Sequence, residues 1–178
     1  GALSMGLGAC GGYLAGPRDI IEYLRYDLPG VVFSVGIAPP LAAATLTSIR
    51  LLREDPSIMA RMRENIACFL KEAAARNLNT CLAAGTAIVP VLIGRDEDAF
   101  HLSNRLREHG VFVPPAVYPA VPRGKARLRF CVISEHKPEQ IVKALDLLVK
   151  LAAEDGIALP PAKPAEAPKA EPRTATFA

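Results

Sequence analysis

The sequence predicts an α/β fold, because segments with helical periodicity alternate with short segments typical of strands. The clearest helix follows Asp55-Pro56, a capping residue and a first-turn proline. Its apolar residues recur at three- and four-residue spacing, as one stripe of a long amphipathic helix: Ile58, Met62, Ile66, Phe69, Leu70 and Ala73. The clearest strands are residues 87–93 and 126–133. Helices packed against a sheet are the expected result.

The remaining elements follow in order along the chain. We expect helices over residues 19–28, 41–53, 96–109 and 139–153, the third of which ends at Gly110. Short strands are expected at residues 12–16 and 111–113, a strand or extended segment at residues 31–37, and a loop at residues 114–124. Pro90 predicts that its strand lies at a sheet edge, because proline has no N–H for a second neighbouring strand.

The composition narrows the class of protein. The chain has 178 residues, of which 51% are apolar and 22% charged, so it suits one domain or a large part of a two-domain enzyme. A net charge of +3 without a run of Lys and Arg argues against nucleic acid as a partner. Charges or prolines interrupt every apolar stretch, which argues against a membrane span. Four separated cysteines without a CxxC motif predict no zinc site and a reduced, cytoplasmic protein.

The two ends of the chain differ from its middle. The first twelve residues are Gly-rich and are typical of the middle of a motif rather than its start. We therefore expect the chain to be a piece of a longer polypeptide. Residues 157–178 are rich in Pro, Ala, Lys and Glu. Such a segment buries too little apolar surface to offset the entropy lost on ordering, so we expect a disordered tail or linker there.

The Gly-rich start contains a GxGxxG pattern at Gly6, Gly8 and Gly11. A dinucleotide site would need a strand before this pattern, a helix opening at it and an acidic residue about 20 positions later. Few residues precede Gly6, and those that follow Gly11 favour a strand over a helix. A glycine-dense loop in which backbones approach closely explains the pattern better. A nucleotide-binding module remains an alternative.

Arg127 and Arg129 alternate with Leu128 and Phe130 in a predicted strand. Alternation places both guanidinium groups on the face opposite the apolar side chains, about 7 Å apart. Two neighbouring like charges favour an anion, and a guanidinium donates two parallel hydrogen bonds to a carboxylate. The pattern therefore indicates either a carboxylate site or a solvated strand face. His136 follows the strand and fits a turn or cap better than a catalytic base.

Several motifs occur in order over residues 1–151. They are GALSMGLGACGGY at the start, VFSVG at residues 32–36 followed by Pro39-Pro40, VPP at 113–115, YPAVP at 118–122, and ARLRF at 126–130 with His136 beyond it. This series resembles the carboxy-terminal part of the α-oxoamine synthases, pyridoxal-phosphate enzymes that condense an acyl-CoA with an amino acid. The family includes 8-amino-7-oxononanoate synthase, aminoketobutyrate CoA ligase and serine palmitoyltransferase.

The resemblance assigns roles to five positions. Where the family has a lysine that holds the cofactor covalently and carries a proton, this sequence has Met5, and it has Ala2 in place of a threonine. Ser4 matches a phosphate contact, and Ser34 matches a hydroxyl that reaches the phosphate of the neighbouring subunit's cofactor. Arg129 matches the arginine that binds the substrate carboxylate. A thioether forms no imine, so Met5 occupies the catalytic position without being competent there. No metal site is implied.

The resemblance also implies an architecture: the second half of a fold-type-I pyridoxal-phosphate transferase. Residues 1–38 would end the large cofactor-binding domain, and residues 39–156 would form a small α/β domain with antiparallel strands. The implied cofactor is pyridoxal 5′-phosphate, and the implied assembly is a homo- or heterodimer. The implied reaction is decarboxylative condensation of an amino acid with an acyl-CoA or acyl thioester. Because Met5 replaces the lysine, we expect this chain alone to be inactive. A non-catalytic partner subunit or pseudoenzyme domain is the alternative.

Overall fold

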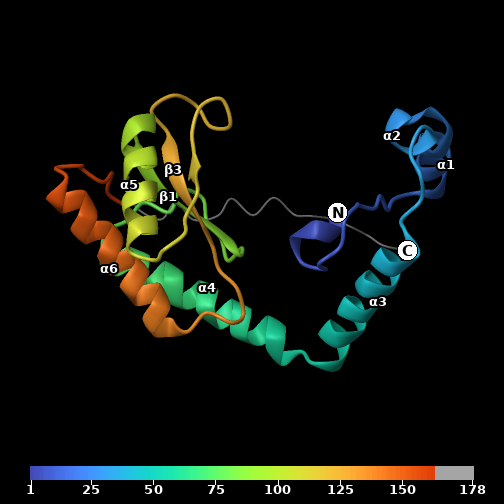
Figure 1. Ribbon diagram of the computed structural model, residues 1–178, viewed down its shortest axis with the longest axis horizontal. Coiled ribbons are helices and arrows are strands. Elements are labelled where there is room, and N and C mark those ends of the chain that lie inside the picture. Colours follow the sequence, from blue (N-terminus) through green and yellow to red (C-terminus); the bar gives the residue numbers. More distant parts are fainter. Residues whose placement is uncertain (163–178) are drawn as a thin grey trace. The chain divides into compact units, whose positions relative to one another are not determined.

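The chain forms two compact units in the computed structural model, which describes residues 1–162. The first unit is Gly1–Met59, and the second begins at Ala60. Figure 1 shows the helices and strands of each unit. The named elements of the first unit are all helices, whereas the second unit combines a sheet with helices. Within residues 1–162, none of the helices has both the length and the apolar character needed to span a membrane.

A three-stranded antiparallel sheet forms the centre of the second unit, in the order β1-β3-β2. Its strands are β1 (Ile88–Gly94), β2 (Pro115–Ala116) and β3 (Ala126–Cys131). Val89 pairs with Phe130 and Val91 pairs with Leu128, so these side chains share one face, where all four are buried. Strand β1 lies at an edge of the sheet, which confirms the position predicted from Pro90.

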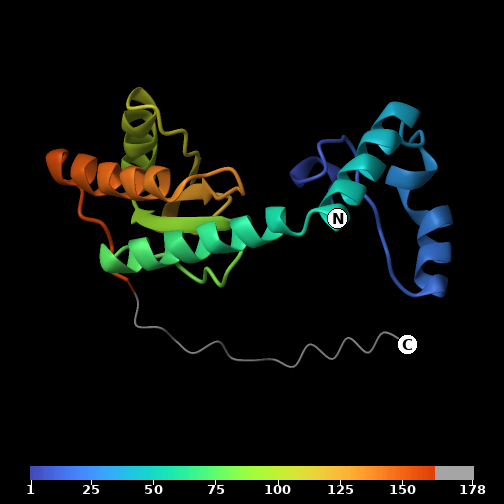
Figure 2. The same cartoon turned by 90° about the horizontal axis from the view of Figure 1, so that it is seen from below.

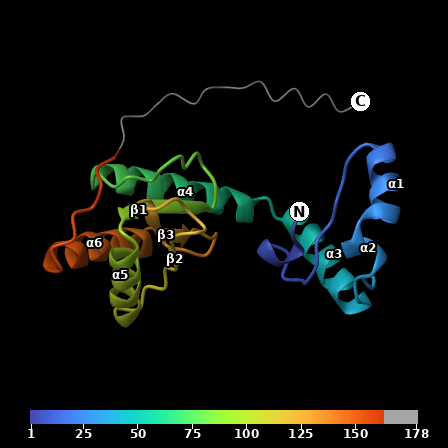
Figure 3. The same cartoon turned by 90° about the horizontal axis from the view of Figure 1, so that it is seen from above.

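Three helices pack with this sheet and close its core: α4 (Ser57–Ala75), α5 (Asp96–Glu108) and α6 (Pro138–Glu154). Figures 2 and 3 show them arranged around the strands. Their apolar residues and the buried sheet face form one hydrophobic cluster. Within it, the ring of Phe69 in α4 lies 5.1 Å from the ring of Phe130, measured between centroids. All three helices confirm the sequence predictions.

The ends of these helices follow from the local sequence. At the start of α4, the backbone N–H of Ser57 donates to the Asp55 carboxylate over 3.0 Å, so the predicted cap is confirmed. After α5, Gly110 has a φ of +82°, a left-handed conformation that glycine adopts without steric cost. At the start of α6, the backbone N–H of Lys137 donates to the side chain of Gln140 over 2.9 Å.

The first unit has little core of its own. Its elements are η1 (Leu3–Met5), α1 (Arg18–Asp27), α2 (Pro29–Val32) and α3 (Pro39–Glu54). Helices α1 and α3 confirm the two helices predicted in this region. Leu3 and Ala9 are its buried hydrophobic residues, whereas Tyr26, Phe33 and Val35 are largely exposed.

The strand or extended segment predicted over residues 31–37 is wrong at its first two residues, which are helical, and the rest forms no strand. Val31 and Val32 instead end α2, and their backbone N–H groups both donate to the carbonyl of Leu28. Pro29 favours this turn, because its fixed φ suits the first position of a helix. β-branched residues favour a strand only where a neighbouring strand offers hydrogen bonds. Residues 12–16 likewise form no strand in the described structure, apart from an isolated bridge between Ala2 and Gly12.

The strand predicted over residues 111–113 is also wrong. The backbone N–H of Val111 donates to Leu106 over 2.9 Å and so closes the end of α5. Pairing with β3 begins only at Pro115 and Ala116, which form β2. Val113 is buried in the core without belonging to a strand.

The start of the predicted tail packs against the loop that follows α4. The N–H of Ile157 donates to Ala152 over 2.8 Å. The side chain of Asn79 donates to the carbonyl of Pro161 over 3.0 Å, and the N–H of Ala162 donates to the carbonyl of Asn77 over 3.0 Å. The disorder predicted for the rest of the tail concerns residues 163–178, which lie outside the described residues.

Candidate functional site

Arg127 and Arg129 lie on the face of β3 opposite its buried side chains, as their alternation predicts. Both arginines are half-buried, but their surroundings differ. The Arg127 Nε donates to the carbonyl of Lys125 over 3.1 Å. The Arg129 guanidinium has no hydrogen-bond or ion-pair partner among the residues that the structure describes. Arg129 is therefore the arginine of this pair that is available to an anion.

A Pro-rich loop forms a wall beside Arg129. Residues 114–120 and Arg129 line a shallow hollow on the surface of the second unit. The backbone N–H of Arg129 donates to the carbonyl of Pro114 over 2.9 Å, which ties the loop to β3. Farther along, the guanidinium of Arg123 lies 4.2 Å from the centroid of the Tyr118 ring, a cation–π contact that stabilises the loop. An unpaired guanidinium beside a walled hollow suits a carboxylate ligand.

The Gly-rich block in the first unit folds into a closed loop. The backbone N–H of Leu3 donates to the carbonyl of Gly11 over 2.9 Å. Gly8 and Gly11 have φ values of +65° and +114°, conformations that other residues rarely adopt. Within the described residues, a 3-10 turn rather than a strand precedes Gly6, and no helix opens at the pattern. The glycine-dense loop is thus confirmed, and the strand and helix that a dinucleotide site needs are not found around it.

The residues to which the resemblance assigns roles occupy separate places. Ser4 and Met5 are neighbours in η1, where both are exposed, and the adjacent Leu3 is buried and anchors the turn. Ser34 follows α2 in the first unit, and its hydroxyl donates to the carbonyl of Val35 over 3.1 Å. Arg129 lies in the second unit. The structure thus brings Ser4 and Met5 together in one turn, while Ser34 belongs to the first unit and Arg129 to the second.

These side chains fit a phosphate group but not a covalently held pyridoxal phosphate. The exposed hydroxyl of Ser4 can donate to a phosphate oxygen, and that of Ser34 can do so in place of its bond to Val35. Met5 is 69% exposed and presents a thioether, which has no N–H and no exchangeable proton. Met5 can therefore neither form an imine with the cofactor nor move a proton at a substrate. In the described part of the chain, no cluster of three His, Cys, Asp or Glu residues could hold a metal ion.

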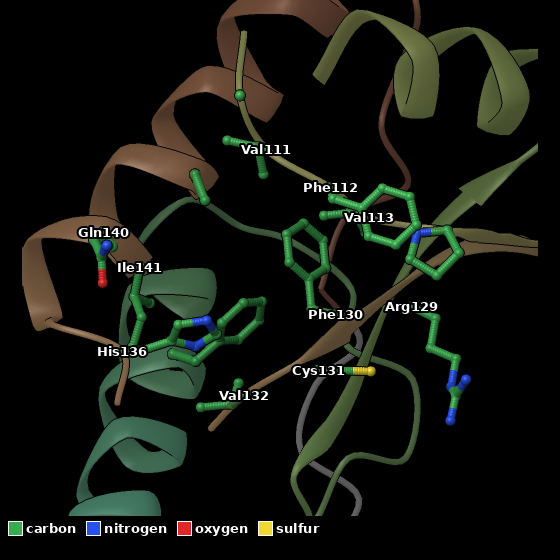
Figure 4. A pocket seen from close by; sticks show the side chains of 14 residues that line it. Val111, Phe112, Val113, Arg129, Phe130, Cys131, Val132, His136, Gln140 and Ile141 are labelled. Atoms are coloured by element: carbon green, nitrogen blue, oxygen red, sulfur yellow. The ribbon is translucent and has the colours of Figure 1, made fainter. Parts of the chain in front are cut away.

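Sequence reasoning missed a pocket inside the second unit. The pocket has a volume of about 360 Å³ and lies between β3, the first turns of α6 and residues 110–114. Figure 4 shows His136 and Ile141 together on one side of it, with Phe130 between them and Val113. Strand and helix periodicity predicts that such residues face inward. Periodicity does not predict that the packing of these residues leaves a pocket between them.

Asn65 is a second feature that sequence reasoning missed. It is only 6% exposed in α4, and its side-chain amide donates to the carbonyls of Ile133, Ser134 and His136 over 3.0, 3.4 and 2.7 Å. These bonds fix the turn between β3 and α6. His136 completes the turn, because its Nδ1 accepts the N–H of Ile133 over 3.3 Å, which agrees with the turn role predicted for it. The signal in the sequence was the position of Asn65 on the apolar stripe of a predicted helix, which indicates a buried side chain that needs hydrogen-bond partners.

A comparison with solved structures defines the class of protein. The chain resembles a serine palmitoyltransferase of Sphingomonas wittichii with a TM-score of 0.77 and 26% identity. The match covers 89% of this chain and 40% of that chain. The chain therefore has the mixed α/β fold, with an antiparallel sheet, of one part of a fold-type-I pyridoxal-phosphate transferase, and the predicted fold class is confirmed.

The chain belongs to the aminotransferase class I and II family, whose model matches residues 1–148. It is 39% identical over 154 residues to 8-amino-7-oxononanoate synthase 1 of Bacillus velezensis, which covers 86% of this chain and 39% of that relative. It is 31% identical over 150 residues to 2-amino-3-ketobutyrate coenzyme A ligase of Salmonella typhimurium, which covers 84% and 37%. These homologues are α-oxoamine synthases, so the resemblance is confirmed. The chain spans about two fifths of the length of the relatives it matches.

Proposed function

We propose that this chain is the substrate-binding, carboxy-terminal part of an α-oxoamine synthase and that Arg129 binds the carboxylate of the amino-acid substrate. The observation that carries the proposal is the unpaired, half-buried guanidinium of Arg129 on the open face of β3. A bidentate guanidinium–carboxylate pair at such a place holds its ligand in one orientation. The neighbouring Arg127 already bonds to Lys125, which supports a different role for it.

The reaction we propose for the complete assembly is decarboxylative condensation of an amino acid with an acyl-CoA or another acyl thioester. Pyridoxal phosphate would supply the electron sink at the α-carbon. This chain would supply hydroxyls for the phosphate at Ser4 and Ser34 and the carboxylate ligand at Arg129. The amine that anchors the cofactor would have to come from elsewhere, because Met5 has none. The chain alone should therefore be inactive, and the active form would be a homo- or heterodimer.

A non-catalytic partner subunit is a second candidate function, and Met5 is the observation that favours it. The exposed thioether stands beside Ser4 in a turn that is otherwise well formed, with Leu3 buried and the loop closed by its backbone. A chain that keeps this architecture without the amine could support a catalytic partner. In that case the unmodified chain should increase the activity of a lysine-bearing partner.

The test compares four variants in assemblies that contain the missing upstream part of the enzyme, supplied from a relative. Acyl-thioester cleavage that depends on an amino acid is measured. Met5→Lys should restore turnover and trapping of pyridoxal phosphate by borohydride, whereas the unmodified chain should show neither. In the Met5→Lys background, Arg129→Lys should raise the KM for the amino acid about tenfold or more, because a hydrogen bond to a charged group contributes about 1.5–3 kcal/mol.

Arg127→Lys is the matched control and should change that KM by less than about twofold, because Arg127 bonds to the loop rather than to substrate. Equal effects of the two substitutions would reduce Arg129 to a solvated charge. Trapping of cofactor at residue 5 of the unmodified chain would refute the role given to Met5. Stimulation of a lysine-bearing partner by the unmodified chain would favour the second candidate function.

A further inference from the structure

The pocket in the second unit has the size and walls of a binding site for an apolar ligand. Its volume of about 360 Å³ falls in the range of about 300–1,000 Å³ that small-molecule sites occupy. Its apolar walls are Phe130 of β3 and Val132 just after that strand, Ile141 and Ala144 of α6, Phe69 of α4, and residues 110–114. The side chain of Arg129 points away from these rings and methyl groups (Figure 4). A hydrocarbon chain is therefore the ligand that the walls favour.

The polar side chains of Arg129, Gln140 and His136 also line the pocket, and a backbone hydrogen bond orients the imidazole of His136. Its Nδ1 accepts a hydrogen bond from the N–H of Ile133, so the ring proton of the neutral imidazole is on Nε2. Nε2 has no hydrogen-bond partner in the part of the chain that the structure describes. Asn65 holds the carbonyls of this turn and so fixes the position of the ring. His136 thus offers a preorganised donor to a ligand in the pocket.

We propose that the pocket binds the unbranched chain of the acyl substrate and that His136 Nε2 donates to an oxygen of that substrate. This inference rests on the proposed function, which requires an acyl thioester. The amino-acid substrate is a poorer occupant, because an ammonium group needs an acidic partner and the residues that line the pocket include no Asp or Glu. A carbonyl or carboxylate oxygen matches the donor at His136, and methylene groups match the apolar walls.

The test uses the full chain without cofactor and measures the binding of hexanoate, octanoate and decanoate by titration calorimetry. Each added methylene should increase affinity about fourfold until the pocket is full, because burial of a methylene is worth about 0.8 kcal/mol. Filling the pocket with Ala144→Leu should abolish this increase. Ala153→Leu makes the same change at an exposed position of the same helix and should retain it.

A second variant tests the donor. His136→Asn keeps an acceptor near the N–H of Ile133 but removes Nε2, and it should weaken binding about fivefold at every chain length, since one hydrogen bond contributes about 1 kcal/mol. In methyl NMR spectra, octanoate should shift the signals of Ile141 and Val111, which line the pocket, and leave the signals of Ile20 in the first unit unchanged.

Two outcomes would overturn the inference. One is chain-length dependence that survives Ala144→Leu, because the fatty acid would then bind elsewhere, for example on the exposed apolar residues of the first unit. The other is the absence of any binding, because the pocket would then not accept a hydrocarbon chain. Neither outcome affects the proposed function, whose test is amino-acid-dependent turnover in the Met5→Lys assembly. Failure of that turnover with binding intact would refute the function and leave the pocket a fatty-acyl site.

Discussion

Apolar residues make up a similar fraction of the sequence in the two units, but the units use them differently. Apart from Leu3 and Ala9, the buried hydrophobic residues of the described chain all lie in the second unit. In the first unit, even aromatic side chains are exposed, with Tyr26 at 83% and Phe33 at 87%. An amphipathic helix therefore contributes to a core only where another element presents an apolar face for it to pack against. The second unit has its sheet for this purpose, and the first unit needs a surface from outside itself.

The largest expected difference between the units concerns association. The exposed apolar side chains of the first unit should cause the full chain to self-associate in sedimentation velocity experiments. Replacing Tyr26, Phe33 and Val35 by serine should shift the chain toward monomer. Serine at Leu82 and Phe100, which are exposed on the second unit, is the control and should leave association unchanged. If the unmodified chain stays monomeric across a wide concentration range, the exposed apolar side chains of the first unit do not drive association.

The second prediction compares one substitution in two helices. Leu145 of α6 is fully buried, so Leu145→Ala should reduce the free energy of unfolding by about 2–5 kcal/mol through lost burial and a cavity. Leu46 of α3 is 47% exposed, and Leu46→Ala should cost about 0.5 kcal/mol or less. Urea unfolding followed by circular dichroism measures both values. Similar losses would mean that the first unit has a core that Leu46 joins.

The third prediction concerns the buried amide that holds the turn after β3. Asn65→Ala should reduce the free energy of unfolding by about 1–3 kcal/mol, because three carbonyls lose their donor in a buried place. Amide hydrogen exchange should accelerate in residues 133–136. Asn104 is exposed on α5, so Asn104→Ala should change neither quantity. Unchanged exchange in Asn65→Ala would show that the turn is held by other contacts.

The smallest expected effect concerns Arg76, which joins α4 to α6. Its guanidinium lies 2.6 Å from Glu72 and 2.7 Å from Asp146, and hydrogen bonds to Glu72 and then to Asp146 raise the pKa of Arg76. Arg76→Met should cost about 1 kcal/mol of the free energy of unfolding. Arg95 lies 74% exposed at longer distances from its acidic neighbours, so Arg95→Met should cost nothing measurable.

The pH dependence of the Arg76 contribution follows from the sign of this shift. A raised pKa in the folded state stabilises the fold at every pH below the unfolded pKa, and the contribution is lost only as the pH rises through the folded pKa. That window lies above the ordinary pKa of arginine. Titration of Arg76 should therefore not change the difference in the free energy of unfolding between Arg76→Met and the unmodified chain from pH 6 to pH 9. Urea titrations at several pH values test this.

The five longer helices were predictable from the sequence because their signals are local, whereas the short helix α2 was not predicted. The cap at Asp55, the stop at Gly110 and the apolar stripe of α4 each depend on residues a few positions apart. Strands were less predictable, since residues 31–37 have β-branched side chains but no neighbouring strand in the described structure. The sheet face on which Arg127 and Arg129 lie was predictable, because side chains alternate between the two faces along any strand.

The sequence by itself determined the five longer helices, the edge position of β1, the orientation of Arg129 and the absence of an amine at Met5. These properties depend on residue type and on short-range periodicity. Only the tertiary structure decided that Arg129 is unpaired while Arg127 is not, that Asn65 holds a distant turn, and that a pocket remains beside His136. Each of these depends on which atoms from separate elements meet, and that is set by packing of the whole unit rather than by any one segment.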